Sequence, residues 1–300
     1  MRRIASAILA TVALVAPACA QTASRDLGQS EGSLGQATTS ALDVRYVGNE
    51  GFLVEGAGQR VLVDGLVGNI EGYIDPPAEI RNGLEDGTGE WRDVRVAMAT
   101  HHHRDHFDAE STIRFLEANR GAIFVSTPQA FELFSDQLGS EYSHREDLLG
   151  RFRAILPAEG VIEPLEIEGI RIDVLNLHHG RRTPPVENLG FIVTLGRHRF
   201  LHFGDTEAKM EDFEPYLDRL RGTELALLPF WFLSSDWRAQ MVRELIRPTW
   251  IVAAHLPTPD APTGHFGRWR SYDNLLQVMR EAFPSARFAT DPGASYHFDS

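Results

Sequence analysis

Short β-prone runs separated by glycine-bearing turns occupy the chain from residue 41 to residue 64. Their spacing predicts a meander of antiparallel strands at 44–47, 52–55 and 60–64. An apolar strand follows at 94–100, and the segment 111–119 then carries apolar residues at helical spacing. The same strand and helix alternation returns at 122–125 and at Thr127-Pro128, because a proline suits the first turn of a helix.

A second β-rich region begins at residue 165 and is again followed by helices. We expect strands at 165–167, 170–177, 191–195, 200–203, 225–228 and 250–254, and helices at 213–221, 237–246 and 272–283. Two β-rich halves, each continued by strand and helix pairs, predict an α/β fold in which two sheets pack face to face with helices outside.

The first twenty residues have the pattern of a secretory signal peptide. Arg2 and Arg3 precede the apolar run 4–15, and Ala18-Cys19-Ala20 fits the small residues of a cleavage site. The run is shorter than the roughly 20 residues that a spanning helix needs, so we expect no stable membrane span after cleavage. This predicts a periplasmic or secreted protein; a lipoprotein acylated at Cys19 is the alternative.

Residues 21–40 are small and polar, which predicts a disordered leader before a folded domain at 41–300. Cys19 is the only cysteine, so the mature chain has no disulfide and no thiolate metal ligand. The net charge is −13, and removal of the signal with its two arginines brings it to −15. This charge repels polyanions, so we expect a small-molecule substrate and no nucleic acid. The oligomeric state is not predicted.

The strand at 94–100 leads directly into His101-His102-His103-Arg104-Asp105-His106. Two imidazoles two residues apart share one side of an extended backbone, so His101 and His103 can bind one ion. Asp105 and His106 point elsewhere and can serve a second ion. The alternative is a chance histidine cluster on a surface loop. The position after a buried strand and the aspartate at fixed spacing favour a site for two metal ions.

Residues 100–106 match the HxHxDH signature, and the chain thereby resembles the metallo-β-lactamase superfamily. Other motifs of that family appear in order: Asp64 resembles its early supporting aspartate, Asp205 its metal-bridging carboxylate, and His255 its last ligand. The resemblance covers roughly residues 42–256. It implies a four-layer αββα sandwich, although a turn role for Asp64 or Asp205 and a core role for His255 are the ordinary alternatives.

The resemblance also implies a division of ligands between two ions. The first ion takes His101, His103 and a third histidine, the second takes Asp105, His106 and His255, and Asp205 bridges them. His178 or His179 is the third histidine, and adjacent strand residues face opposite ways. We choose His179 because it borders Gly180 at the mouth of a loop.

The resemblance implies a hydrolase that uses a metal-bridging hydroxide, with Asp105 as a further acceptor of the nucleophile's proton, and the signal peptide implies that this hydrolase is exported. Nitrogen and oxygen ligands suit Zn²⁺ first, while Mn²⁺ and Fe²⁺ also accept them. True lactamases of this fold lack an aspartate bridge, so Asp205 favours an ester-like bond, a lactone or a phosphodiester. The alternatives are a β-lactam hydrolase, an iron-dependent oxidoreductase on the same fold, and a metal-binding envelope protein without catalysis.

The segment 187–191 and the short tail after His255 are similar to one branch of the superfamily. That branch contains ascorbate-phosphate lactonase and N-acyl phosphatidylethanolamine phospholipase D. Three arginines, Arg104, Arg181 and Arg182, can meet an anionic group of the substrate, although solvated loop arginines are the ordinary alternative. Three aromatic residues, Phe230, Trp231 and Trp237, can form an apolar wall, for which packing in the core is the ordinary alternative.

Overall fold

A computed structural model of the chain describes residues 41–180, 184–207 and 209–299. The predicted signal peptide at 1–20, the predicted leader at 21–40, and Arg181 and Arg182 lie outside these residues. The first strand begins at Ala41. Within the described ranges, no helix combines the length and the apolar character that a membrane span requires.

Within the described residues the strands form two seven-stranded sheets, and the first contains the predicted meander. Its order is β14-β1-β2-β3-β4-β5-β6, antiparallel from β14 to β3 and parallel from β3 to β6. The strands are β1 (Ala41–Gly48), β2 (Gly51–Gly56), β3 (Gln59–Val63), β4 (Val96–Met98), β5 (Ile123–Ser126), β6 (Phe152–Ala154) and β14 (Ser295–Asp299).

The second sheet has the order β13-β12-β11-β10-β9-β8-β7. It is antiparallel from β7 to β10 and parallel from β10 to β13. The strands are β7 (Glu163–Ile167), β8 (Ile170–Asn176), β9 (Leu189–Leu195), β10 (His198–His202), β11 (Leu225–Pro229), β12 (Trp250–Ala254) and β13 (Arg287–Phe288).

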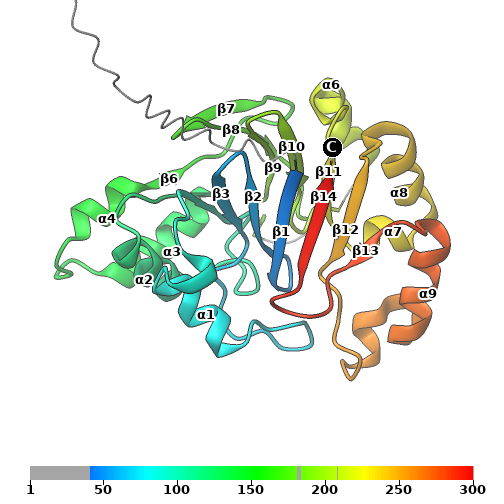
Figure 1. The fold of residues 1–300 in the computed structure, drawn as a ribbon, viewed down its shortest axis with the longest axis horizontal. Coiled ribbons are helices and arrows are strands. Elements are labelled where there is room, and N and C mark those ends of the chain that lie inside the picture. Colours follow the sequence, from blue (N-terminus) through cyan, green and yellow to red (C-terminus); the bar gives the residue numbers. More distant parts are fainter. Residues whose placement is uncertain (1–40, 181–183, 208, 300) are drawn as a thin grey trace, which may run out of the picture. The chain divides into compact units, whose positions relative to one another are not determined.

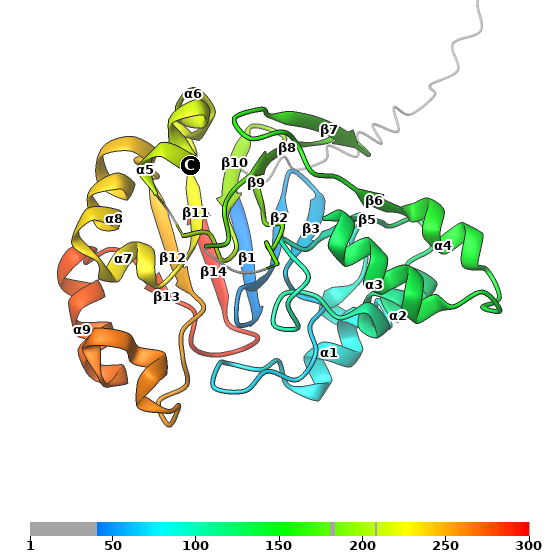
Figure 2. The ribbon, with the colours of Figure 1, turned by 180° about the vertical axis from the view of Figure 1, so that it is seen from behind.

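Helices cover the outer face of each sheet, while the inner faces bury a shared apolar core that includes Phe52, Val193 and Phe200. On the first sheet lie α1 (Ala78–Glu85), η1 (Gly89–Trp91), α2 (Ala109–Ala118), α3 (Pro128–Leu138) and α4 (Arg145–Arg151). On the second lie α5 (Met210–Phe213), η2 (Glu214–Tyr216), α6 (Leu217–Leu220), α7 (Trp231–Ser234), α8 (Asp236–Met241), η3 (Val242–Ile246), η4 (Thr263–Trp269) and α9 (Tyr272–Ala282). Figures 1 and 2 show the two helical groups on opposite sides of the sheets. The predicted four-layer αββα sandwich is confirmed.

Two predicted elements differ from the structure in ways that chemistry explains. The predicted helix 213–221 is broken into α5, η2 and α6, because Pro215 has no N–H to continue an α-helical ladder. The predicted strand 94–100 pairs only at Val96–Met98. After Met98 the chain leaves the sheet and delivers Thr100 and His101 to its edge.

The carboxyl ends of four strands meet at one edge of the sandwich. Asp64 directly follows β3, and His255 directly follows β12. Asp205 comes shortly after β10, and the histidine cluster comes shortly after β4. Ligands of α/β sheets bind outside the carboxyl ends of strands, and both sheets here contribute to one such place.

Candidate metal centre

One group of potential metal ligands lies around His101 and His103. His101 Nε2 lies 3.0 Å from His103 Nδ1 and 3.2 Å from His179 Nε2. The Oδ2 atom of Asp205 lies 3.5 Å from His179 Nε2. These four residues place their ligand atoms within 4.8 Å of one another. Three nitrogens and one oxygen around a common point form a donor set that a divalent metal ion accepts.

A second group lies on the other side of Asp205. His255 Nε2 is 3.3 Å from Asp105 Oδ2 and 3.2 Å from Asp205 Oδ1. His106 Nε2 is 3.3 Å from the same Asp205 Oδ1 atom. Asp105, His106, Asp205 and His255 thus form a second set that can hold a metal. The two oxygens of Asp205 face different groups.

Several donor atoms of these groups are buried without a hydrogen bond. They are His106 Nε2, His255 Nε2 and Asp205 Oδ1. Buried polar atoms are nearly always satisfied, so orphaned lone pairs that face one another mark the place of a cation. The residues present therefore fit a metal.

The electrostatics of the site favour positive charge at its centre. Burial acts to lower the pKa of His106, but Asp205, Asp105 and Asp64 raise it well above its usual value. Burial acts to raise the pKa of Asp105, while His106 and His255 lower it to about 2. The carboxylates of the second group are therefore ionised. A divalent cation can balance their negative charge, as a proton on a neighbouring histidine does. Burial lowers the pKa of His101, so its imidazole stays neutral and keeps a free lone pair.

The Asp64 side chain supports the loop that carries the candidate ligands at 101–106. Its fully buried carboxylate accepts hydrogen bonds from the Thr100 backbone N–H at 2.7 Å and from the Thr100 hydroxyl at 2.8 Å. His106 Nδ1 lies 2.8 Å from Asp64 Oδ2, which leaves His106 Nε2 to face the second group. A carboxylate behind a histidine in this way fixes the ring and raises its basicity as a ligand.

Replacement of Asp64 by asparagine should therefore weaken metal binding about 10- to 100-fold, because the amide cannot accept all of these hydrogen bonds. Competition for Zn²⁺ against a coloured chelator measures the effect. Asp173→Asn is the matched control, since Asp173 is also a buried carboxylate but pairs with Arg171 and Arg219 and belongs to neither group of potential ligands. Equal zinc affinity of Asp64→Asn and the control would contradict the supporting role.

Sequence reasoning missed Glu50 and His202, which extend this network. His202 Nε2 lies 2.8 Å from Asp64 Oδ2 and 3.3 Å from Glu50 Oε2, and all three side chains are fully buried. Burial raises the pKa of Glu50 to about 7, although His202 and His106 act against it. The only signal for His202 was its place three positions before Asp205, which alone does not distinguish it from any strand residue.

Three non-glycine residues of the site have left-handed backbones, namely Asn49, Asp64 and His255, with φ of +44°, +46° and +53°. The backbones are tied together, because the His255 N–H donates to the Asn49 carbonyl at 3.1 Å. The Asn49 side chain in turn donates to the Asp105 carbonyl at 3.1 Å. Such conformations cost of order 1–3 kcal/mol each and concentrate at functional sites.

The structure places His178 and His179, the two candidates for the third histidine, in different environments. The structure places His179 beside His101, whereas His178 is exposed and lies 3.0 Å from Glu159 Oε1. His102 is only half-buried and lies outside both groups of potential ligands. His101, His103, Asp105, His106, Asp205 and His255 are brought together as well.

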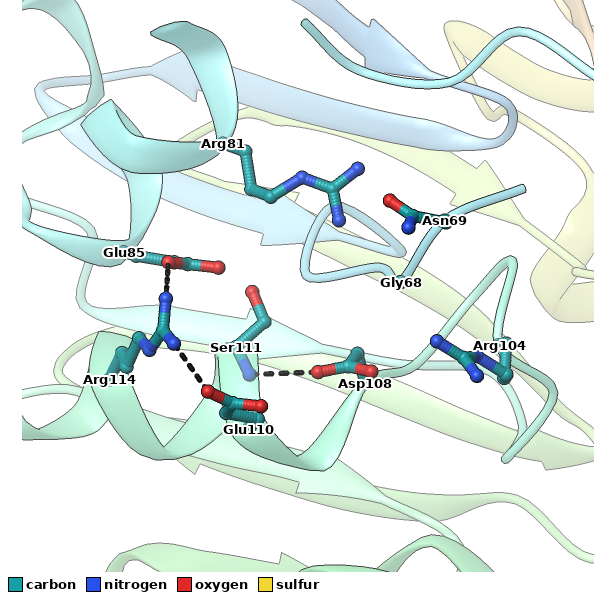
Figure 3. Close-up of a pocket in the computed structure, with 9 residues that line it drawn as sticks. All are labelled: Gly68, Asn69, Arg81, Glu85, Arg104, Asp108, Glu110, Ser111 and Arg114. Atoms are coloured by element: carbon teal, nitrogen blue, oxygen red, sulfur yellow. Dashed lines mark hydrogen bonds and ion pairs between the residues drawn. The ribbon is translucent and has the colours of Figure 1, made fainter. Parts of the chain in front are cut away.

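Arg104 does not join the metal ligands. It lines a separate cavity of about 190 Å³, together with Asn69, Arg81 and residues of α1 and α2 (Figure 3). Arg114, which forms ion pairs with Glu85 and Glu110, also lines this cavity. Arg104 therefore offers no support for the expected contact with an anionic group at the metals.

Aromatic side chains stand beside the second group of ligands. The rings of Tyr73 and Trp231 lie 4.3 Å and 5.2 Å from the His255 imidazole, both edge to face. Trp231 Nε1 donates to the Thr206 carbonyl at 3.0 Å, which fixes the indole. Trp231 is thus close to the site, as the sequence suggested, whereas Trp237 is exposed and stacks with Arg238. Tyr73 had no sequence signal.

Comparison with known proteins agrees with this geometry. Residues 59–266 match the model of a family described as the beta-lactamase superfamily domain. A UPF0173 metal-dependent hydrolase of Aeropyrum pernix is 24% identical over 257 residues, which cover 85% of this chain and 96% of that protein.

Solved structures of similar fold include several metal-dependent enzymes. A possible metal-dependent hydrolase from Veillonella parvula superposes with a TM-score of 0.60 and 14% identity, over 85% of this chain and 99% of that one. A metallo hydrolase from Ignicoccus hospitalis gives 0.57 and 19%, over 87% and 99%. An isothiocyanate hydrolase from Delia radicum gut bacteria gives 0.57 and 14%, over 86% and 100%. At these identities the likeness establishes the fold.

Proposed function

Because the chain belongs to the beta-lactamase superfamily, whose family model matches residues 59–266, we propose that it is a hydrolase that uses two metal ions. The observation that carries the proposal is the position of Asp205, whose Oδ2 and Oδ1 atoms face two different groups of potential ligands. His101, His103 and His179 would hold one ion, Asp105, His106 and His255 would hold the other, and Asp205, which belongs to both groups, would be shared between them. The related hydrolase of Aeropyrum pernix supports metal-dependent hydrolysis.

Bound there, two divalent ions supply an activated water and polarise the bond that it attacks. The protein orients these events through its own side chains. Asp205 and Asp105 both place a carboxylate oxygen near His255 Nε2, and Asp105 would take a proton from the nucleophile. Asn49 holds Asp105 through the hydrogen bond to its carbonyl, so that this base keeps a fixed position.

We propose an ester-like bond, a lactone or phosphodiester, as the target. The ligands on both sides are oxygen and nitrogen donors, and the bridging position is a carboxylate where the commonest lactamases of the fold have a thiolate. Zn²⁺ suits this donor set, and Mn²⁺ or Fe²⁺ are the alternatives.

The experiment is a substrate panel with metal analysis. The purified protein, loaded with Zn²⁺, is assayed on γ-butyrolactone, p-nitrophenyl acetate, bis-p-nitrophenyl phosphate and the β-lactam nitrocefin. We expect two metal ions per chain and hydrolysis of the ester-like probes. Turnover of nitrocefin alone would overturn the ester assignment, and bound iron with oxygen consumption would point instead to an oxidoreductase.

Removal of the metal should abolish this activity. Dialysis against EDTA is expected to lower hydrolysis at least about 10³-fold, because activated water and bond polarisation are both lost. Re-addition of Zn²⁺ should restore the rate, with two equivalents needed for full recovery. Activity that survives complete metal loss, verified by elemental analysis, would contradict the proposal.

The proposal includes export, which rests on the N-terminal sequence pattern. Expression of the full chain in a Gram-negative host should yield a periplasmic protein that begins at Gln21. Intact-mass measurement distinguishes this product from an uncleaved chain and from a lipoprotein acylated at Cys19.

A further inference from the structure

Tyr73 lies in the segment between β3 and α1 and is held beside the ligands on both sides. Tyr73 forms an antiparallel bridge with Pro257, two residues after His255. Its neighbours are also fixed: the Gly72 carbonyl accepts the Thr258 N–H at 3.0 Å, and the Ile74 carbonyl accepts the Asn49 N–H at 2.8 Å. The Tyr73 backbone is thereby tied to the two segments that carry His255 and Asn49.

The aromatic ring is positioned by packing against imidazoles. It meets His255 edge to face at 4.3 Å and His265 edge to face at 5.3 Å. Gly72 has a φ of +81°, and a Cβ atom at this position would contact the His265 ring. The glycine therefore allows His265 to pack directly against the Tyr73 loop. A ring with contacts of this kind keeps a single orientation.

The hydroxyl of Tyr73 has no hydrogen-bond partner among residues 41–180, 184–207 and 209–299, and the side chain is only partly buried. A phenol has an ordinary pKa of about 10, so the hydroxyl keeps its proton at neutral pH. The separation of 4.3 Å between the Tyr73 and His255 rings places the phenol beside the second ligand group. A protonated, unengaged donor at the edge of such a site is available to a substrate.

We propose that Tyr73 is a catalytic residue that donates a hydrogen bond to the oxygen of the substrate on which negative charge develops. This inference rests on the proposed hydrolysis of an ester-like bond. In that reaction the water oxygen bonds to the carbonyl carbon or phosphorus, and its proton passes to Asp105. Charge accumulates on the substrate oxygen, the bond to the leaving oxygen then breaks, and that leaving oxygen takes up the proton. Donors aimed at the developing charge stabilise the transition state more than the bound substrate.

The test compares Tyr73→Phe with Tyr142→Phe, both loaded with Zn²⁺. Phenylalanine keeps the ring that packs on His255 and removes only the hydroxyl. Tyr142 is the matched control. It lies between α3 and α4, outside both groups of potential ligands, and its hydroxyl donates a hydrogen bond to Glu117. For whichever ester-like probe the wild type hydrolyses, kcat of Tyr73→Phe should fall about 10- to 100-fold, with KM changed little. Zinc content and the melting temperature should match the control.

Binding of inorganic phosphate to the zinc-loaded proteins gives a readout without turnover. Because phosphate presents a charged oxygen to the same donor, its Kd by calorimetry should be about ten-fold weaker for Tyr73→Phe than for Tyr142→Phe. If Tyr73→Phe weakened phosphate binding but the wild type hydrolysed none of the probes, the role of Tyr73 as a hydrogen-bond donor would be supported and the ester assignment would be overturned. Equal phosphate affinity, or an effect on KM alone, would overturn the role of Tyr73.

Discussion

Replacement of Asp205 by alanine is expected to lower hydrolysis at least about 10³-fold and to reduce bound metal below two ions per chain. The carboxylate is the one group that both ligand sets share, with Oδ2 facing His179 and Oδ1 facing His106 and His255. Its removal leaves each set with only three protein donors. Loss of several kcal/mol of transition-state stabilisation corresponds to a rate effect of this size. Steady-state assays with elemental analysis of the purified variant measure both effects.

Asp205→Asn separates charge from shape, since the amide retains one oxygen and loses the negative charge. We expect an intermediate metal content and a similarly severe loss of rate. Asp218→Ala, an exposed aspartate of α6, controls for handling and should retain full activity. If Asp205→Ala kept two metals and normal turnover, the bridging role of Asp205 would be wrong.

Replacement of Gly204 by alanine is expected to lower the free energy of unfolding by about 2–5 kcal/mol. Gly204 has a φ of +55°, where alanine costs about 1–2 kcal/mol. An added Cβ would also lie 2.6 Å from the Thr100 Cβ and 2.8 Å from Asn188 Oδ1, and forced overpacking costs about 1–3 kcal/mol. Because Thr100 bonds Asp64, zinc affinity should fall together with stability.

Gly58→Ala is the matched control for this substitution. Gly58 also has a positive φ, +75°, but an added Cβ there would meet nothing within 4 Å. Its loss of stability should be limited to about 1–2 kcal/mol, with unchanged zinc affinity. Urea denaturation of the metal-free proteins compares the two variants directly. Equal destabilisation would show that contact with Thr100 is not what requires glycine at 204.

Much of the fold followed from local patterns. The strands of the meander and the pairs of strand and helix have clear periods, and the two-sheet sandwich is the packing that buries both apolar faces. The C-terminal strand β14 was not predicted, although Tyr296 and Phe298 alternate with polar residues, because a run of five residues with only two large apolar side chains is a short signal. The broken helix at 210–220 shows how one proline overrides apolar spacing.

The candidate site was predictable to the extent that its residues stand in motifs. The cluster at 101–106 can be detected in the sequence because potential ligands are concentrated in six positions. Asp205 and His255 follow it in the order of the family's motifs. Tyr73, Glu50 and His202 carry no such signal. Their roles depend on which loops lie side by side, and pairing such as that of Tyr73 with Pro257 is a long-range property that no local pattern encodes.

The position of the site between the sheets also bears on how the protein folds. Residues 101–106 are carried by the half of the chain that builds the first sheet, whereas His179, Asp205 and His255 belong to the second. Closing such distant contacts carries a large entropic cost and comes late on the folding path, so the chelating geometry exists only once the halves have docked. A metal ion that binds only this assembled geometry therefore stabilises the completed fold relative to partly folded species.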